Sequence, residues 1–102
     1  MAYAEVKSVR YLIQLVLDAG YEVDINDGEE TVITKSTDVD AIMDTMMSTD
    51  EDIVRISHPS RESRIGAFYL VYGNSPEEVI CDHTDNEACG SIADAHAKEF
   101  PY

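Results

Sequence analysis

The sequence has few cysteines, few basic side chains and no long hydrophobic run, and each shortage excludes a class of protein. With only two cysteines, Cys81 and Cys89, a chain of 102 residues has no disulfide framework, although these two can pair or stay free. No stretch of about 18 apolar residues occurs, so we expect no membrane span. The segment Met1–Glu5 lacks a basic leader ahead of an apolar run, which predicts no secretion signal and a cytoplasmic location.

Basic residues are the scarcest charged type, with 7 lysines and arginines against 21 aspartates and glutamates and a formal net charge of −14. Such a field repels nucleic acid and anionic membranes, so we expect no direct nucleic-acid binding and favour a basic partner or simple solubility. The acids concentrate between residues 18 and 52, where twelve of them accompany one base, Lys35. A small basic island follows at Arg55, Arg61 and Arg64.

The spacing of apolar residues predicts the secondary structure. Apolar side chains at helical spacing predict three helices, over 4–19, from about 39 to 46, and after residue 84. Alternating or continuous apolar residues predict five strands at 21–25, 31–34, 53–56, 65–72 and 79–81. Strands joined by short turns pair antiparallel, so we expect one α+β domain over residues 1–102. Its architecture is a single antiparallel sheet of about five strands with three helices, in the order αββαβββα.

Three local patterns make finer predictions. Asn26-Asp27-Gly28 indicates a hairpin turn, with a loop of two or three residues left open. The near-continuous apolar run Ile65–Tyr72 predicts a central strand covered on both faces. Thr84-Asp85-Asn86-Glu87 has the capping-box pattern, which places Thr84 at the start of the last helix.

The residues that could carry metal or catalytic chemistry do not have the required spacing. Cys81, His83, Cys89 and His96 have the right chemistry for zinc, but Cys89 and His96 lie two helical turns apart, about 10 Å along the axis. No nucleophile elbow, cysteine-protease motif or phosphate-binding glycine loop occurs. We therefore predict no metal site, no cofactor and no enzymatic activity, and interpret the buried-type cysteine and histidine as core residues.

The acidic surface admits three interpretations: solubility, adaptation to high salt, or an anionic surface that imitates DNA and occupies a basic groove. For the last, we predict a protein-binding surface on the hairpin and the start of the second helix. Its residues are Asp24, Asp27, Glu29, Glu30, Asp38 and Asp40. Carboxylates in a first helical turn also complement the helix dipole, which accounts in part for Asp38 and Asp40. Glu29 and Glu30 have no such structural reason.

Five segments between residues 20 and 90 stand out: Asn26-Asp27-Gly28-Glu29-Glu30, Lys35-Ser36-Thr37-Asp38, Ser48-Thr49-Asp50-Glu51-Asp52, Leu70-Val71-Tyr72-Gly73-Asn74 and His83-Thr84-Asp85-Asn86. These segments resemble small uncharacterised proteins encoded by tailed bacteriophages. The resemblance implies a phage origin and action in the cytoplasm of an infected bacterium, and it transfers no catalytic residue.

We therefore expect a small acidic phage accessory protein that binds a basic host protein. Inhibition of a nucleic-acid-handling or defence factor through a DNA-mimic surface is the corresponding hypothesis. The alternative is a non-catalytic structural or homo-oligomerising domain whose acidity only confers solubility. Neither hypothesis follows from the fold alone.

Overall fold

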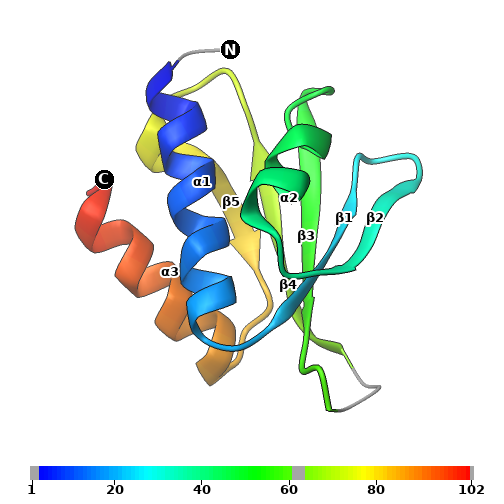
Figure 1. Cartoon of the computed structure of the whole chain (residues 1–102). Coiled ribbons are helices and arrows are strands. Elements are labelled where there is room, and N and C mark those ends of the chain that lie inside the picture. Colours follow the sequence, from blue (N-terminus) through cyan, green and yellow to red (C-terminus); the bar gives the residue numbers. More distant parts are fainter. Residues whose placement is uncertain (1–2, 61–63, 102) are drawn as a thin grey trace.

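The computed structural model describes residues 3–60 and 64–101 (Figure 1). Within these residues the chain forms three α-helices, five strands and one short 3-10 helix, η1. In chain order they are α1 (Tyr3–Asp18), β1 (Glu22–Asn26), β2 (Thr31–Ser36), α2 (Val39–Thr45), β3 (Glu51–Ser57), β4 (Arg64–Val71), η1 (Pro76–Glu78), β5 (Ile80–His83) and α3 (Glu87–Glu99). The predicted α+β class and the order αββαβββα are confirmed.

The strands form one antiparallel sheet in the order β2-β1-β3-β4-β5, with β3 in the middle. Side chains alternate between its two faces, and the three helices pack on the same face (Figure 1). On that face Val54 and Ile56 of β3 are fully buried, whereas their neighbours Ile53 and Arg55 point the other way and are partly exposed. The sheet therefore has one face covered by helices and one open face.

The helices bury one stripe each against the sheet. In α1, Val9, Leu12, Ile13 and Val16 are fully buried. The apolar spacing predicts Val9, Ile13 and Val16 on this face, together with Val6 and Leu17, which are half-buried, and it does not include Leu12. Helix α3 approaches β4 closely at Gly66, where an added Cβ would lie 2.6 Å from Cys89 Sγ. No helix within residues 3–60 and 64–101 is long and apolar enough to cross a bilayer.

Strand β4 corrects one prediction. It is an interior strand, and Phe68 and Leu70 are buried beneath the helices. The prediction that both faces of this strand are covered was wrong, because Tyr69 lies on the open face with 42% of its surface exposed. A run of apolar residues does not reveal whether a second layer exists to cover the other face, and here all three helices pack on one side.

Three boundaries also differ from the predictions. The hairpin loop has four residues, 27–30, and β3 begins at Glu51, two residues before the predicted start of that strand at residue 53. The N-cap of α3 is Asn86, whose Oδ1 accepts a hydrogen bond from Cys89 N at 2.9 Å. Thr84 does not cap the helix because its Oγ1 accepts a hydrogen bond from Ala67 N of β4 at 2.9 Å. Thr84 thus bonds to a strand that is distant in the sequence and does not form the cap that the local pattern predicts.

Candidate functional site

The loop between β1 and β2 carries three of the six predicted binding residues, and one of them, Asp27, forms the turn. Its Oδ1 accepts hydrogen bonds from the backbone N–H groups of Glu29 and Glu30, each at 3.0 Å. The bond from Glu30, and then that from Glu29, lowers the pKa of the Asp27 carboxyl by stabilising its charged form. Gly28 has a φ of +100°, which the turn requires and which side chains disfavour. Asp27 is therefore a charged structural residue.

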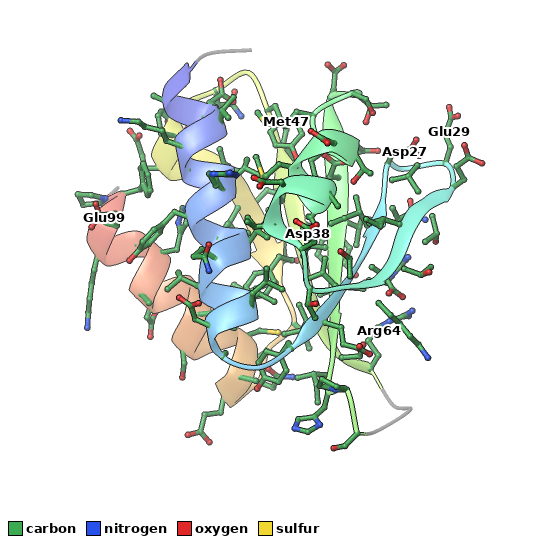
Figure 2. The ribbon with its side chains drawn as sticks, in the orientation of Figure 1. Asp27, Glu29, Asp38, Met47, Arg64 and Glu99 are labelled. Atoms are coloured by element: carbon green, nitrogen blue, oxygen red, sulfur yellow. The ribbon has the colours of Figure 1, made fainter. Side chains whose placement is uncertain are left out.

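Glu29 and Glu30 are exposed at the tip of the hairpin, where Figure 2 shows Glu29 projecting away from the sheet. Their backbone N–H groups hold the turn, but their carboxylates make no hydrogen bond or ion pair with any residue that the structure describes. Within the part of the chain that the structure describes, no stabilising contact accounts for two adjacent acids here.

A second acidic segment lies beside the tip. Thr49 Oγ1 is 3.0 Å from the carbonyl oxygen of Asp27 and 2.6 Å from that of Glu51, so its hydroxyl joins the loop before β3 to the hairpin. A groove lies between them, lined by Asp27, Gly28, Glu29, Thr49, Asp50 and Glu51. We define these residues with Glu30 as the acidic tip. The predicted surface did not include Asp50 and Glu51. Their only signal in the sequence is the density of acids at 50–52, which does not indicate that this segment lies beside the hairpin.

Asp24 has a structural role inside the sheet. Its Oδ1 accepts a hydrogen bond from the backbone of Lys35 at 2.7 Å, where Lys35 has a φ of 48° and the pairing of β1 with β2 is irregular. Its Oδ2 lies 3.9 Å from Arg64 Nη2. Of the predicted basic island, Arg55 lies opposite Asp24 on β3, and Arg61 lies outside the described residues.

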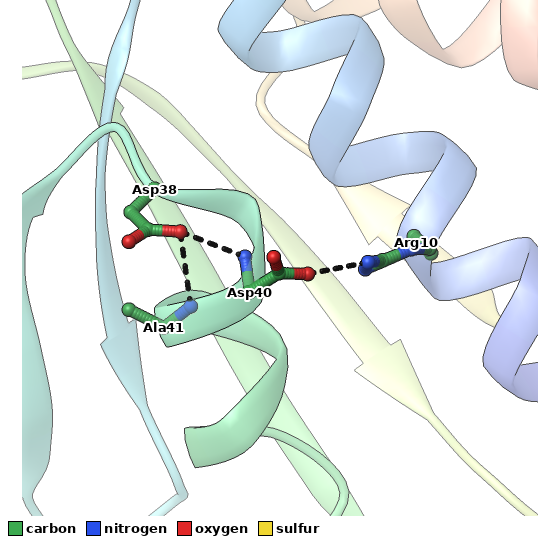
Figure 3. Close-up of polar contacts among 4 residues, drawn as sticks. All are labelled: Arg10, Asp38, Asp40 and Ala41. Atoms are coloured by element: carbon green, nitrogen blue, oxygen red, sulfur yellow. Dashed lines mark hydrogen bonds and ion pairs between the residues drawn. The ribbon is translucent and has the colours of Figure 1, made fainter.

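The two acids at the start of α2 also have partners (Figure 3). Asp38 is the N-cap, and its Oδ1 accepts hydrogen bonds from Asp40 N at 3.0 Å and from Ala41 N at 3.3 Å. Asp40 forms an ion pair with Arg10 of α1 at 2.5 Å, with both side chains largely exposed. Such an exposed pair contributes about 0–1 kcal/mol.

The six predicted residues therefore do not form one patch. Strand β2 separates the acidic tip from Asp38 and Asp40, and its six residues span roughly 20 Å at about 3.3 Å per residue. Figure 2 shows Glu29 at the tip and Asp38 at the far end of β2. The binding surface stays a prediction, and the unpaired acids Glu29 and Glu30 are its best-supported members.

The open face of the sheet carries a groove next to the acidic tip. The strand register aligns one row of residues across it, Asn26, Ile53, Tyr69 and Asp82. The groove has a volume of about 330 Å³ and is lined by Gly28, Glu51, Asp52, Ile53, Tyr69, Leu70, Val71, Cys81 and Asp82. It is apolar along Ile53, Tyr69 and Val71 and acidic at Glu51 and Asp82.

A buried serine and histidine link three elements. Ser8 Oγ lies 2.9 Å from His96 Nε2 and donates a hydrogen bond to the carbonyl of Pro76 at 2.7 Å. The spacing is that of a nucleophile and its base. Ser8 is however fully buried and its proton is already donated, so the pair holds α1, α3 and η1 together and offers no reachable nucleophile.

The predicted soft ligands are dispersed in the fold. Cys81 is an exposed free thiol, and Cys89 is buried, which raises the pKa of its thiol. His83 Nδ1 lies 2.9 Å from the carbonyl of Thr84, and His96 contacts Ser8. In the part of the chain that the structure describes, no three acidic, cysteine or histidine side chains are placed to hold one metal ion.

Comparisons with protein-family models, curated proteins and solved structures find no match for this chain. The resemblance to tailed-phage proteins therefore stays a hypothesis, and function must be argued from the site.

Proposed function

We propose that this protein is a non-catalytic binding protein whose acidic tip engages a basic surface of a partner protein. The observation that carries the proposal is the unpaired state of Glu29 and Glu30 beside Asp50 and Glu51. Two like charges in water repel each other by about 1 kcal/mol at 4 Å, and no contact within the described residues offsets this. A basic partner would remove the repulsion and gain attraction.

The proposed partner is a host nucleic-acid-handling or defence protein in the cytoplasm of an infected bacterium, and the proposed result is inhibition. Its groove for nucleic acid would be basic, and closely spaced carboxylates stand in for phosphates there. A net charge of −14 accelerates the encounter, with an effect that falls as salt rises. This part of the proposal rests on the resemblance to tailed-phage proteins.

The test compares three immobilised proteins in a bacterial lysate: wild type, E29Q/E30Q and D94N/E99Q. The last variant removes an equal number of negative charges, two, from exposed positions on α3, away from the hairpin (Figure 2). We expect a basic protein to bind wild type and D94N/E99Q at low salt, and to be displaced by high salt or duplex DNA. We expect E29Q/E30Q to capture much less of it. Equal capture by all three would overturn a role for the acidic tip.

The alternative is a structural or oligomerising domain, and the open sheet face with its exposed Tyr69 is the observation that favours it. Sedimentation equilibrium separates the two proposals. A stable dimer or larger assembly at low micromolar concentration would support the alternative. A monomer that binds a basic protein through Glu29 and Glu30 would support the first.

A further inference from the structure

We infer that the groove on the open sheet face binds an arginine of the basic partner, with the guanidinium stacked on Tyr69 between Asp82 and Glu51. This inference rests on the proposed function and deepens it, since it names the chemistry that the partner must present. The partner segment is a protein chain in which an arginine alternates with aliphatic residues.

The position of Tyr69 is the first argument. It lies in an interior strand of the sheet, yet it is one of two large apolar side chains in the described residues that are strongly exposed, at 42%. An aromatic ring held on a sheet between Ile53 and Asp82 presents a fixed surface. Tyrosine gives a large contact area with little loss of side-chain freedom, which makes it common at binding hot spots.

The charges around the ring are the second argument. Asp82 lies directly opposite Tyr69, at the distance of paired strand residues, about 5 Å between Cβ atoms. Glu51 pairs with Val71 and is therefore a diagonal neighbour of the ring. Arg55 also occupies a diagonal position beside Ala67, but it does not line the groove. The ring is thus flanked by two carboxylates, and no base among the described residues lines the groove.

These features together select a cation, and arginine in particular. A guanidinium is planar and weakly hydrated, so it stacks on an aromatic face and pairs with a carboxylate at the same time. Lysine presents a compact, strongly hydrated charge and gains less from the ring. The aliphatic side chains Ile53 and Val71 would contact the apolar neighbours of the arginine, and Gly28 joins the groove to the acidic tip.

The experiment titrates isotope-labelled protein with three capped peptides: Leu-Arg-Leu-Arg-Leu and its counterparts with lysine or glutamine in place of arginine. We expect amide shifts centred on Ile53, Tyr69 and Asp82, with affinity in the order arginine, lysine, glutamine. The Cys81 thiol lines the groove and is exposed, so the arginine peptide should also slow its alkylation.

Variants assign the contact. Y69L keeps an apolar side chain without the ring and should weaken the arginine peptide about two- to fivefold. D82N should reduce both the affinity and its salt dependence. V32A is the control, because Val32 is the other exposed large apolar residue, at 37%, and lies outside the groove. Circular dichroism and melting temperature confirm that each variant folds.

The outcomes separate this inference from the proposed function. If E29Q/E30Q abolishes partner capture while Y69L and D82N do not, the acidic tip binds and the arginine site is overturned. If the peptides shift no groove residue at millimolar concentration, or bind equally with glutamine, the inference is also overturned. If wild type dimerises at the titration concentration and Y69L is monomeric, the face joins two copies and holds no arginine segment.

Discussion

At the scale of single residues, Asp52 is a buried carboxyl group with a hydrogen-bonded oxygen and an oxygen that accepts no hydrogen bond from a described residue. It is fully buried, and its Oδ2 accepts hydrogen bonds from Met47 N at 2.8 Å and from Tyr72 Oη at 2.5 Å. Its Oδ1 has no partner among the described residues. Burial raises the pKa of the Asp52 carboxyl, and burial together with Asp52 raises that of the Tyr72 hydroxyl, which therefore stays protonated as the donor.

The first prediction concerns the charge of Asp52. In D52N the amide oxygen can take the place of Oδ2 and keep both hydrogen bonds, while no charge is buried. Its amide nitrogen then takes the place of Oδ1, where no described residue accepts a hydrogen bond, so we expect D52N to be destabilised less than D52A at pH 7 in urea unfolding. D52A should lose about 1–3 kcal/mol, because the buried Tyr72 hydroxyl and the partly buried Met47 N–H lose their acceptor. D94N is the control for net charge, and a D52N loss as large as that of D52A would contradict this account.

The same raised pKa has a consequence for the pH dependence of folding. The folded state holds the Asp52 proton more tightly than the unfolded state, whose carboxyl has an ordinary pKa of about 3.9. The stability that this proton contributes is complete below that value and is lost as pH rises through the folded-state pKa. We expect the free energy of unfolding, measured in urea as a function of pH, to show this loss in wild type and not in D52N.

At the scale of elements, periodicity predicted the helices and strands because each one buries a single face. The stripe Val9–Val16 and the alternation around Val54 are local patterns with one physical cause, burial. The errors came from contacts between distant segments. Thr84 was assigned to a helix cap but bonds to β4, and Tyr69 was assigned to a covered face that has no cover.

In the candidate site, too, the roles set by neighbouring residues could be predicted, and those set by contacts between distant segments could not. The structural roles of Asp27 and Asp38 lie within a few residues of each acid, so a turn and a cap could be predicted. The approach of Asp50 to the tip depends on the register of β1 with β3 and on the Thr49 hydroxyl. Neither has a local signature in the sequence.

The second prediction tests the approach of α3 to β4. A Cβ at Gly66 would lie 2.6 Å from Cys89 Sγ, and Cys89 is fully buried. We expect Gly66→Ala to destabilise the protein by about 1–3 kcal/mol through overpacking. Cys89→Ala removes the clashing sulfur, so the double variant should lose less than the sum of the two single losses. A double-mutant cycle in urea measures this coupling, and strictly additive losses would show that the two sites do not touch.

The third prediction concerns the junction of α1, α3 and η1. Burial lowers the pKa of His96, partly offset by its hydrogen bond to the carbonyl of Ser8 at 3.2 Å. The unfolded state, with a histidine pKa of about 6.5, then takes up its proton first. Stability from this group is complete above that value and lost as pH falls through the folded-state pKa.

We therefore expect wild type to lose stability between about pH 6.5 and the folded-state pKa of His96, and His96→Gln to lose less over that range. At pH 7 the substitution should cost about 1–3 kcal/mol, because the buried Ser8 loses a partner. Nuclear magnetic resonance of the His96 ring reports its titration directly. A His96 that titrates at an ordinary pKa would contradict the buried junction.

At the scale of the whole molecule, size and charge together make stability depend on salt. The molecule measures 35 × 27 × 21 Å and carries a net charge of −14. At about 0.01 M salt the Debye length is about 30 Å, so nearly all its charges interact, and repulsion among the 21 acids outweighs their attraction to the 7 bases. At about 0.15 M the length is about 8 Å, and only neighbouring charges interact. We expect the free energy of unfolding in urea to rise between these two conditions.

The fourth prediction uses this difference in range to locate the repulsion. At about 0.01 M salt, E29Q/E30Q and D94N/E99Q should both stabilise the protein, because each removes two charges from the same long-range field. At about 0.15 M only E29Q/E30Q should still do so, since Glu29 shares its groove with Asp27, Asp50 and Glu51. Asp94 instead has Lys98 one helical turn away on α3, at the i, i+4 spacing that brings side chains together. Equal effects of the two variants at about 0.15 M would mean that the acids of the tip do not repel one another at short range. A partner protein would then relieve no repulsion there, and the proposed function would lose its main support.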